Sequence, residues 1–161
     1  MAPIISCRSP KTIARNQNID YICFHNEQSA AMAADAVWRV TRKPGVTVVT
    51  SGPGATNLIT GIACSYFDSI PSIHITGQVN KSESIRGVNA RQIGFQETDI
   101  VSVVKPLTKY AKLVTDPKTI KYREVDKTGD NKDCVKVLLK RSISCKYIDL
   151  MPCQFTIRSF H

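Results

Sequence analysis

Two short segments carry residue types that could do chemistry. Glu27 follows Asn26 at the start of an Ala-rich stretch. A carboxylate there either acts as a general acid–base group or simply complements a helix dipole. The other segment, Ser51-Gly52-Pro53-Gly54, is not a phosphate loop, because no lysine follows Gly54, and it lacks the dinucleotide-binding fingerprint. Taken alone, it is typical of a tight strand-to-helix turn that requires glycine.

Alternating strands and helices are expected to position these segments. Apolar runs predict strands at residues 20–24, 46–50 and 72–76, with the first buried and the second buried on both faces of the sheet. Small-residue helices should follow the first two runs and reach about residues 40 and 67. A short helix from about residue 95 and a strand within residues 107–114 complete the pattern. This order predicts an α/β fold with a parallel sheet, whose functional loops share the carboxyl edge. The loops expected there are residues 25–27, 51–54 and 77–79.

Length and composition narrow the class of protein. The chain has 161 residues, enough for one domain, with 42% hydrophobic and 22% charged residues. Its net charge of +9 comes from dispersed Lys and Arg residues without aromatic interleaving, so a nucleic-acid partner is disfavoured. No apolar run reaches the ~20 residues that cross a membrane. Because the first residues are too short in apolar character for a secretory signal, we expect a cytoplasmic protein.

Cysteine and histidine spacing argues against a metal centre. The six cysteines are scattered without a Cys-x-x-Cys pair, and the three histidines show no ligand spacing. Three cysteines, including Cys23 and Cys64, lie in or beside apolar stretches. The pattern predicts reduced thiols that behave as small hydrophobic side chains, and no metal site.

A longer series of motifs makes the combination specific. The segments, in order, are His25-Asn26-Glu27-Gln28-Ser29-Ala30, Lys43-Pro44-Gly45-Val46, Thr50-Ser51-Gly52-Pro53-Gly54-Ala55-Thr56-Asn57, Asp68-Ser69-Ile70-Pro71, Thr76-Gly77-Gln78-Val79 and Gly94-Phe95-Gln96-Glu97-Thr98-Asp99-Ile100-Val101. Their order and spacing resemble the N-terminal pyrimidine-binding domain of thiamine-diphosphate enzymes of the acetolactate synthase large-subunit group. The resemblance runs from about residue 12 to residue 122.

The resemblance implies a fold and a set of roles. The fold is a three-layer α/β sandwich with a mainly parallel sheet. The glutamate at the position of Glu27 hydrogen-bonds a ring nitrogen of the cofactor's aminopyrimidine and acts as its acid–base group. The turn of Gly52, Pro53 and Gly54 brings backbone close to that ring. Phe95 and Gln96 match positions on the substrate side, although a capped helix start with a core aromatic explains them equally well.

Several features depart from the family pattern. The sequence has no Gly-Asp-Gly followed by Asn, the motif that holds Mg²⁺ and the diphosphate, so we expect Mg²⁺ from a domain absent here. The first strand and most of the first helix are expected to be missing or degenerate before residue 19, which leaves the N-terminal edge incomplete. Arg42 stands where relatives usually carry glycine. We therefore predict a pyrimidine-binding domain over residues 1–122 and a divergent tail of uncertain structure over residues 123–161.

The sequence thus predicts the pyrimidine-side half of an acetolactate-synthase-like enzyme of branched-chain amino acid biosynthesis, acting on a 2-keto acid. As an isolated chain it is expected to be inactive. It would need a diphosphate-binding domain or subunit, in a homo- or hetero-oligomer. Two alternatives stay open: a subunit of a split thiamine-diphosphate decarboxylase, or a non-catalytic interaction module that keeps the fold. Asn57 is interpreted as a residue that fixes its own helix rather than one that touches a ligand.

Overall fold

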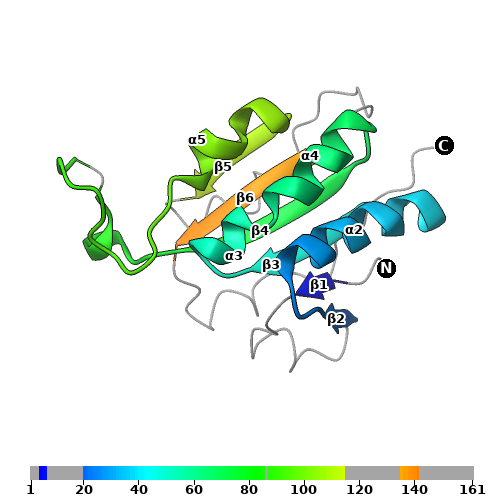
Figure 1. Cartoon of the computed structure of the whole chain (residues 1–161), viewed down its shortest axis with the longest axis horizontal. Helices are drawn as coiled ribbons and strands as arrows, with labels where there is room; N and C mark the ends of the chain where they lie inside the picture. The colour runs from blue at the N-terminus through cyan, green and yellow to red at the C-terminus, as the bar shows by residue number, and fades with distance from the viewer. Residues whose placement is uncertain (1–3, 7–19, 86, 115–134, 142–161) are drawn as a thin grey trace.

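Six parallel strands form one sheet in the order β2-β1-β3-β4-β6-β5 (Figure 1). The computed structural model describes residues 4–6, 20–85, 87–114 and 135–141. The strands are β1 (Ile4–Ser6), β2 (Tyr21–Cys23), β3 (Gly45–Val49), β4 (Ser72–Gln78), β5 (Tyr110–Val114) and β6 (Val135–Arg141). The α-helices are α2 (Glu27–Thr41), α3 (Pro53–Thr56), α4 (Ile59–Phe67) and α5 (Ile100–Val104), with single 3-10 turns η1 (Lys81–Glu83) and η2 (Lys105–Leu107).

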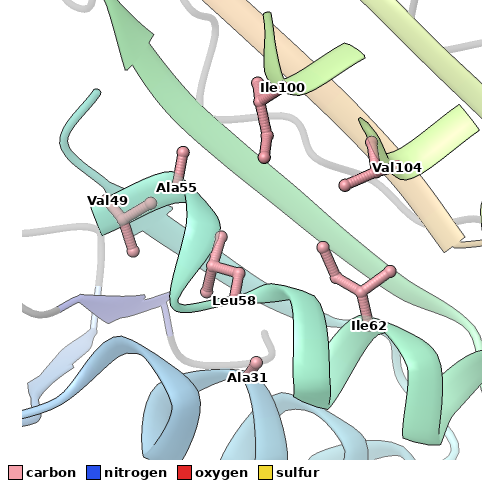
Figure 2. Packing of buried hydrophobic residues seen from close by; sticks show 7 residues of the cluster. All are labelled: Ala31, Val49, Ala55, Leu58, Ile62, Ile100 and Val104. Carbon is pink, nitrogen blue, oxygen red and sulfur yellow. The ribbon is translucent and has the colours of Figure 1, made fainter. Parts of the chain in front are cut away.

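Helices α2 to α5 share one face of this sheet. Each of these helices contributes apolar side chains to one cluster with β3, made of Ala31, Val49, Ala55, Leu58, Ile62, Ile100 and Val104 (Figure 2). Gly61 of α4 sits against α2 so closely that a Cβ there would lie 2.3 Å from the Cβ of Ala31. The parallel α/β architecture is therefore confirmed. A second helical layer on the opposite face stays a prediction.

A row of polar side chains lies beneath the helices. Thr47 and Val49 are two residues apart on β3 and so share the face that packs on the cluster. In the parallel register Thr47 lies opposite His74, and Val49 lies opposite Thr76. Thr47, His74 and Thr76 are all buried. The hydroxyl of Thr47 lies 2.8 Å from Nδ1 of His74, whereas Thr76 Oγ1 finds no hydrogen-bond partner in the part of the chain that the structure describes.

This difference predicts opposite effects for the same substitution on neighbouring strands. Thr76→Val is expected to raise the free energy of unfolding by about 1 kcal/mol, because it removes a buried hydroxyl without a partner. Thr47→Val is expected to lower it by roughly 1–3 kcal/mol, because it leaves a ring nitrogen of His74 unsatisfied. Urea denaturation of both variants measures the difference, and a shared sign would contradict the assignment.

The ends of α2 follow the sequence closely. Arg42, which follows the helix, has φ 58° and ψ 23°, and its N–H donates to the carbonyl of Trp38 at 2.9 Å. This left-handed conformation favours glycine, the residue expected from the resemblance. The predicted stop of the helix at residues 42–45 is confirmed, with β3 starting at Gly45.

Other elements differ from the prediction. The run at residues 20–24 was predicted to be buried, but β2 is an edge strand whose side chains are exposed. The first strand, expected to be missing or degenerate, is present as the three-residue β1, which pairs with both β2 and β3. The expected loss of the first helix falls outside the described residues. The small-residue helix after β3 is broken at Asn57 into α3 and α4. The helix expected from residue 95 begins only at Ile100.

The sheet also uses chain beyond residue 122. Strand β6 pairs with β4 on one side and β5 on the other. The division of the chain at that residue stays a prediction, although the sheet itself extends past it. Cys23 and Cys64 are free thiols, as predicted, but they are exposed rather than packed among apolar side chains. Within the described ranges, no helix has the length and apolar character needed to cross a membrane.

Candidate active site at the carboxyl edge of the sheet

Glu27 opens helix α2 and is half-buried. The preceding residue, Asn26, has extended backbone angles and caps the helix. Its side-chain oxygen accepts hydrogen bonds from the backbone N–H groups of Gln28 at 2.8 Å and Ser29 at 3.4 Å. Because the cap satisfies these first N–H groups, the start of the helix is fixed at the residue that carries the carboxylate.

The glycine turn connects β3 to α3. Gly52 has φ 62° and ψ −125°, a conformation that side chains disfavour, and a Cβ there would lie 2.5 Å from the carbonyl oxygen of Gln96. A Cβ on Gly54 would lie 2.6 Å from Cγ2 of Thr50. Both glycines are therefore required by packing within the chain, as the turn interpretation predicts. Their role towards a cofactor stays a proposal.

Glu27 and the glycine turn meet in space. A Cβ on Gly54 would lie 3.5 Å from Oε1 of Glu27, so this carboxylate oxygen approaches the turn. The other oxygen, Oε2, accepts a hydrogen bond of 3.0 Å from Nδ2 of Asn57. The structure thus brings together the start of α2 and the segment after β3, which lie about 30 residues apart in sequence.

The segment after β4 joins the same edge. A Cβ on Gly77 would lie 3.1 Å from the backbone nitrogen of Ser51, which places the end of β4 beside the turn. The side chain of Gln78 accepts from the N–H of Val79 and donates to the carbonyl of Thr98, both at 2.9 Å. The three predicted loops therefore gather at one edge, and the loop after β4 projects beyond it (Figure 1).

Phe95 and Gln96 return from this projecting loop to the turn. Gln96 has φ 56° and packs its backbone against Gly52. The side chain of Phe95 is 82% exposed, so the alternative in which it is a core aromatic is wrong. Helix α5 starts later, with Asp99 as its cap, which accepts from the N–H of Ser102. Both residues lie on the approach to the turn rather than in a helix.

At a distance from this edge, a network of polar side chains joins helix α2 to helix α4. Asp35 of α2 is buried and accepts a hydrogen bond of 3.1 Å from Oγ of Ser65 in α4. Arg39 forms ion pairs with Asp35 and with Asp68, which follows α4. The hydrogen bond that Arg39 donates to Asp35, and then the one that it donates to Asp68, raise the pKa of Arg39, which keeps its guanidinium charged. Helix α2, which carries Glu27, and helix α4, which follows Asn57, are thereby joined at a second place.

Comparison with known proteins decides the family. Residues 9–103 match the family described as thiamine pyrophosphate enzyme, N-terminal TPP binding domain. This chain belongs to that family. The acetolactate synthase large subunit of Cyanidium caldarium is 49% identical over 102 residues, which are 63% of this chain and 16% of that protein. Acetolactate synthase from Arthrospira platensis is 48% identical over 99 residues, 62% of this chain and 16% of that protein.

A third relative gives the same picture. Acetolactate synthase isozyme 3 large subunit of Escherichia coli strain K12 is 45% identical over 102 residues, 63% of this chain and 17% of that protein. The chain thus spans about one sixth of the curated relatives that it matches. Those relatives contain further domains, and this chain corresponds to their thiamine-pyrophosphate-binding N-terminal portion.

The side chains at this edge of the TPP-binding domain suit one end of the cofactor. Glu27 and Asn57 supply a carboxylate and an amide, which hydrogen-bond ring nitrogens and amino groups. A diphosphate is usually held by cations, metal ions or helix N-termini. Across the described ranges, no group of three His, Cys, Asp or Glu side chains could hold a metal ion. The residues present fit the aminopyrimidine end.

The contact of Asn57 with Glu27 in this TPP-binding domain was not predicted from the sequence. The prediction was that Asn57 fixes its own helix, but its side chain bonds to Glu27. A signal was present, because Gly54 and Asn57 are three residues apart and so share one side of a helical turn. That side could be assigned to Glu27 only once the packing of α2 beside α3 was known.

Proposed function

We propose that this chain supplies the pyrimidine side of a thiamine-diphosphate site in an acetolactate-synthase-like enzyme, with Glu27 as the acid–base residue. The observation that carries the proposal is the half-buried carboxylate of Glu27 set against Gly54 and Asn57 at the carboxyl edge of a parallel sheet. The order of the strands supports it. β2, which follows β1 in sequence, lies on one side of the neighbouring pair β1 and β3, and β4, which follows β3, lies on the other. The strand order thus reverses between β1 and β3, and ligands of such folds bind at this kind of switch point.

Each residue has a defined task in this proposal. Glu27 exchanges a proton with a ring nitrogen of the aminopyrimidine, for which a half-buried carboxylate is suited. Gly52, Pro53 and Gly54 present backbone to the ring. Phe95 and Gln96, beside the turn, face the 2-keto acid substrate. When bound, thiamine diphosphate supplies the nucleophilic carbon and the electron sink for decarboxylation and carboligation.

We further propose that the assembled enzyme is a homo- or hetero-oligomer in which another domain or subunit holds Mg²⁺ and the diphosphate. The 161-residue polypeptide alone is then inactive. The sheet is completed into a three-layer sandwich, and the enzyme acts in the cytoplasm in branched-chain amino acid biosynthesis. The exclusion of nucleic-acid partners also belongs to this proposal.

Thiamine tests the pyrimidine side alone, because it carries the aminopyrimidine without phosphate. Added to the isotope-labelled chain, it is expected to shift the backbone NMR signals of Glu27, Gly52 and Gly54. Glu27→Gln should weaken this binding by roughly tenfold, since a hydrogen bond to a charged group is worth about 1.5 kcal/mol or more. Glu83→Gln is the matched control, because it removes the same charge from η1 on the projecting loop. Equal weakening by both substitutions would contradict the site.

Calorimetry with thiamine diphosphate and Mg²⁺ extends the same test to the half-site. Little heat is expected for the parent chain and for Glu27→Gln, and no turnover of a 2-keto acid. Tight Mg²⁺-dependent binding to the parent chain would overturn the half-site. A partner chain that restores both binding and turnover would identify the split enzyme. A tight partner complex unaffected by Glu27→Gln would instead favour the interaction module.

A further inference from the structure

The side chain of Asn57 is not used by its own helix. Asn57 follows α3, and its backbone N–H donates to the carbonyl of Pro53 at 3.0 Å, which closes the helical turn through the main chain. The side-chain amide instead donates to Oε2 of Glu27 at 3.0 Å. The two residues are 30 positions apart, so this contact exists only because the fold brings α2 beside α3.

The association of the helices does not depend on this contact. The close approach of Gly61 to Ala31 is tight, and the hydrogen bond between Ser65 and Asp35 is buried. The bond from Asn57 to Glu27 lies in an exposed position, so the two helices should stay packed against each other when it is removed. Its measurable consequence should therefore be found on the carboxylate of Glu27.

We infer that Asn57 is a positioning residue, whose amide fixes the Glu27 carboxylate against the glycine turn and stabilises its ionised form. This inference rests on the proposed function for its meaning towards the aminopyrimidine. An amide suits the task, because it donates a hydrogen bond without carrying a charge or a proton that titrates near neutral pH. A lysine or arginine in its place would hold the carboxylate ionised and oppose the return of a proton to it.

The hydrogen bond from Asn57 also orients the carboxylate. With Oε2 held by Asn57, rotation of the carboxylate is restricted, and Oε1 stays directed towards Gly54. Gly54 belongs to the turn that the proposed function assigns to the pyrimidine ring. Asn57 thus acts on the ring through Glu27, and it need not touch the cofactor itself.

The pKa of Glu27 tests this inference without any cofactor. NMR titration of a chain labelled at its glutamate carboxyl carbons should give a midpoint for Glu27 that rises by about half a pH unit to one pH unit in Asn57→Ala. Asn57→Asp should raise it further, because a second carboxylate replaces the donor. Glu97 serves as an internal reference. Its carboxylate accepts hydrogen bonds from Ser84 and Ile85.

A second measurement uses the parent chain, so that the inference can be tested even if the Asn57 variants do not fold. The side-chain amide signal of Asn57 should titrate with the same midpoint as the Glu27 carboxyl carbon. Unchanged Glu27 midpoints in folded variants, or an Asn57 amide signal that ignores the titration of Glu27, would overturn the inference. If the Glu27 midpoint moves as expected but thiamine does not bind, the proposed function fails and the contact itself stands.

Discussion

Lowering the pH from 7 to 4 is expected to reduce the free energy of unfolding by about 3 kcal/mol through His74 alone. His74 is buried on β4 under the helices, and burial lowers its pKa from 6.5 to about 4. The unfolded chain takes up the proton as the pH falls below 6.5, whereas the folded chain does so only near pH 4. The unfolded state therefore binds more protons in this window, and stability falls with pH until the effect levels off below 4.

The environment of the ring explains why the neutral form is retained. Thr47 Oγ1 lies 2.8 Å from Nδ1, and Ser72 Oγ lies 2.9 Å from Nε2. A hydroxyl either donates or accepts, so the pair satisfies a neutral imidazole in either tautomer. Both hydrogen-bond partners of the ring are hydroxyls, which carry no charge to offset that of an imidazolium. Burial thus dominates, and protonation favours the unfolded chain.

Urea denaturation at a series of pH values, followed by the fluorescence of the single tryptophan Trp38, measures this effect. The difference between the parent chain and His74→Gln is the informative quantity, because the carboxylates titrate in both. The difference should change by about 3 kcal/mol between pH 7 and 4. His25→Gln, at an exposed histidine, should follow the parent chain. A constant difference would show that His74 is protonated in the fold without penalty.

Local signals predicted the elements around the site well. The cap at Asn26, the stop at Arg42 and the β-branched run of β3 each depend on residues within one turn or one strand. The glycine turn was placed correctly for the same reason. These features meet at the edge where parallel strands end, so the neighbourhood of Glu27 and the turn could be predicted.

Contacts between distant segments could not be predicted in this way. Strand β1 has only three residues, too few for a periodic pattern, and β2 carries an apolar sequence although it lies at an edge. The place of β6 between β4 and β5 is set by pairing across the sheet. The bond from Asn57 to Glu27 likewise depends on how α2 packs beside α3.

The contact of Gly52 with Gln96 leads to the second large effect. Gly52→Ala is expected to lower the free energy of unfolding by roughly 3 kcal/mol. Two causes add: the conformation at φ 62° disfavours a side chain, and the new Cβ would lie 2.5 Å from the carbonyl oxygen of Gln96. Because the carbonyl oxygen belongs to the backbone, the clash can be relieved only if the segment of Phe95 and Gln96 moves away from the turn.

Gly87→Ala separates these two causes. Gly87 has φ 84°, but a Cβ there would meet nothing within 4 Å, so this variant carries the conformational strain without the clash. The free energy of unfolding of Gly87→Ala should be lower than that of the parent chain by roughly 1 kcal/mol, measured by the same urea denaturation. Gly52→Ala should also diminish the thiamine-induced NMR shifts, whereas Gly87→Ala should leave them unchanged. Equal losses of stability in the two variants would mean that the segment of Gln96 yields without cost. Phe95 and Gln96 would then not be held at the turn by this contact.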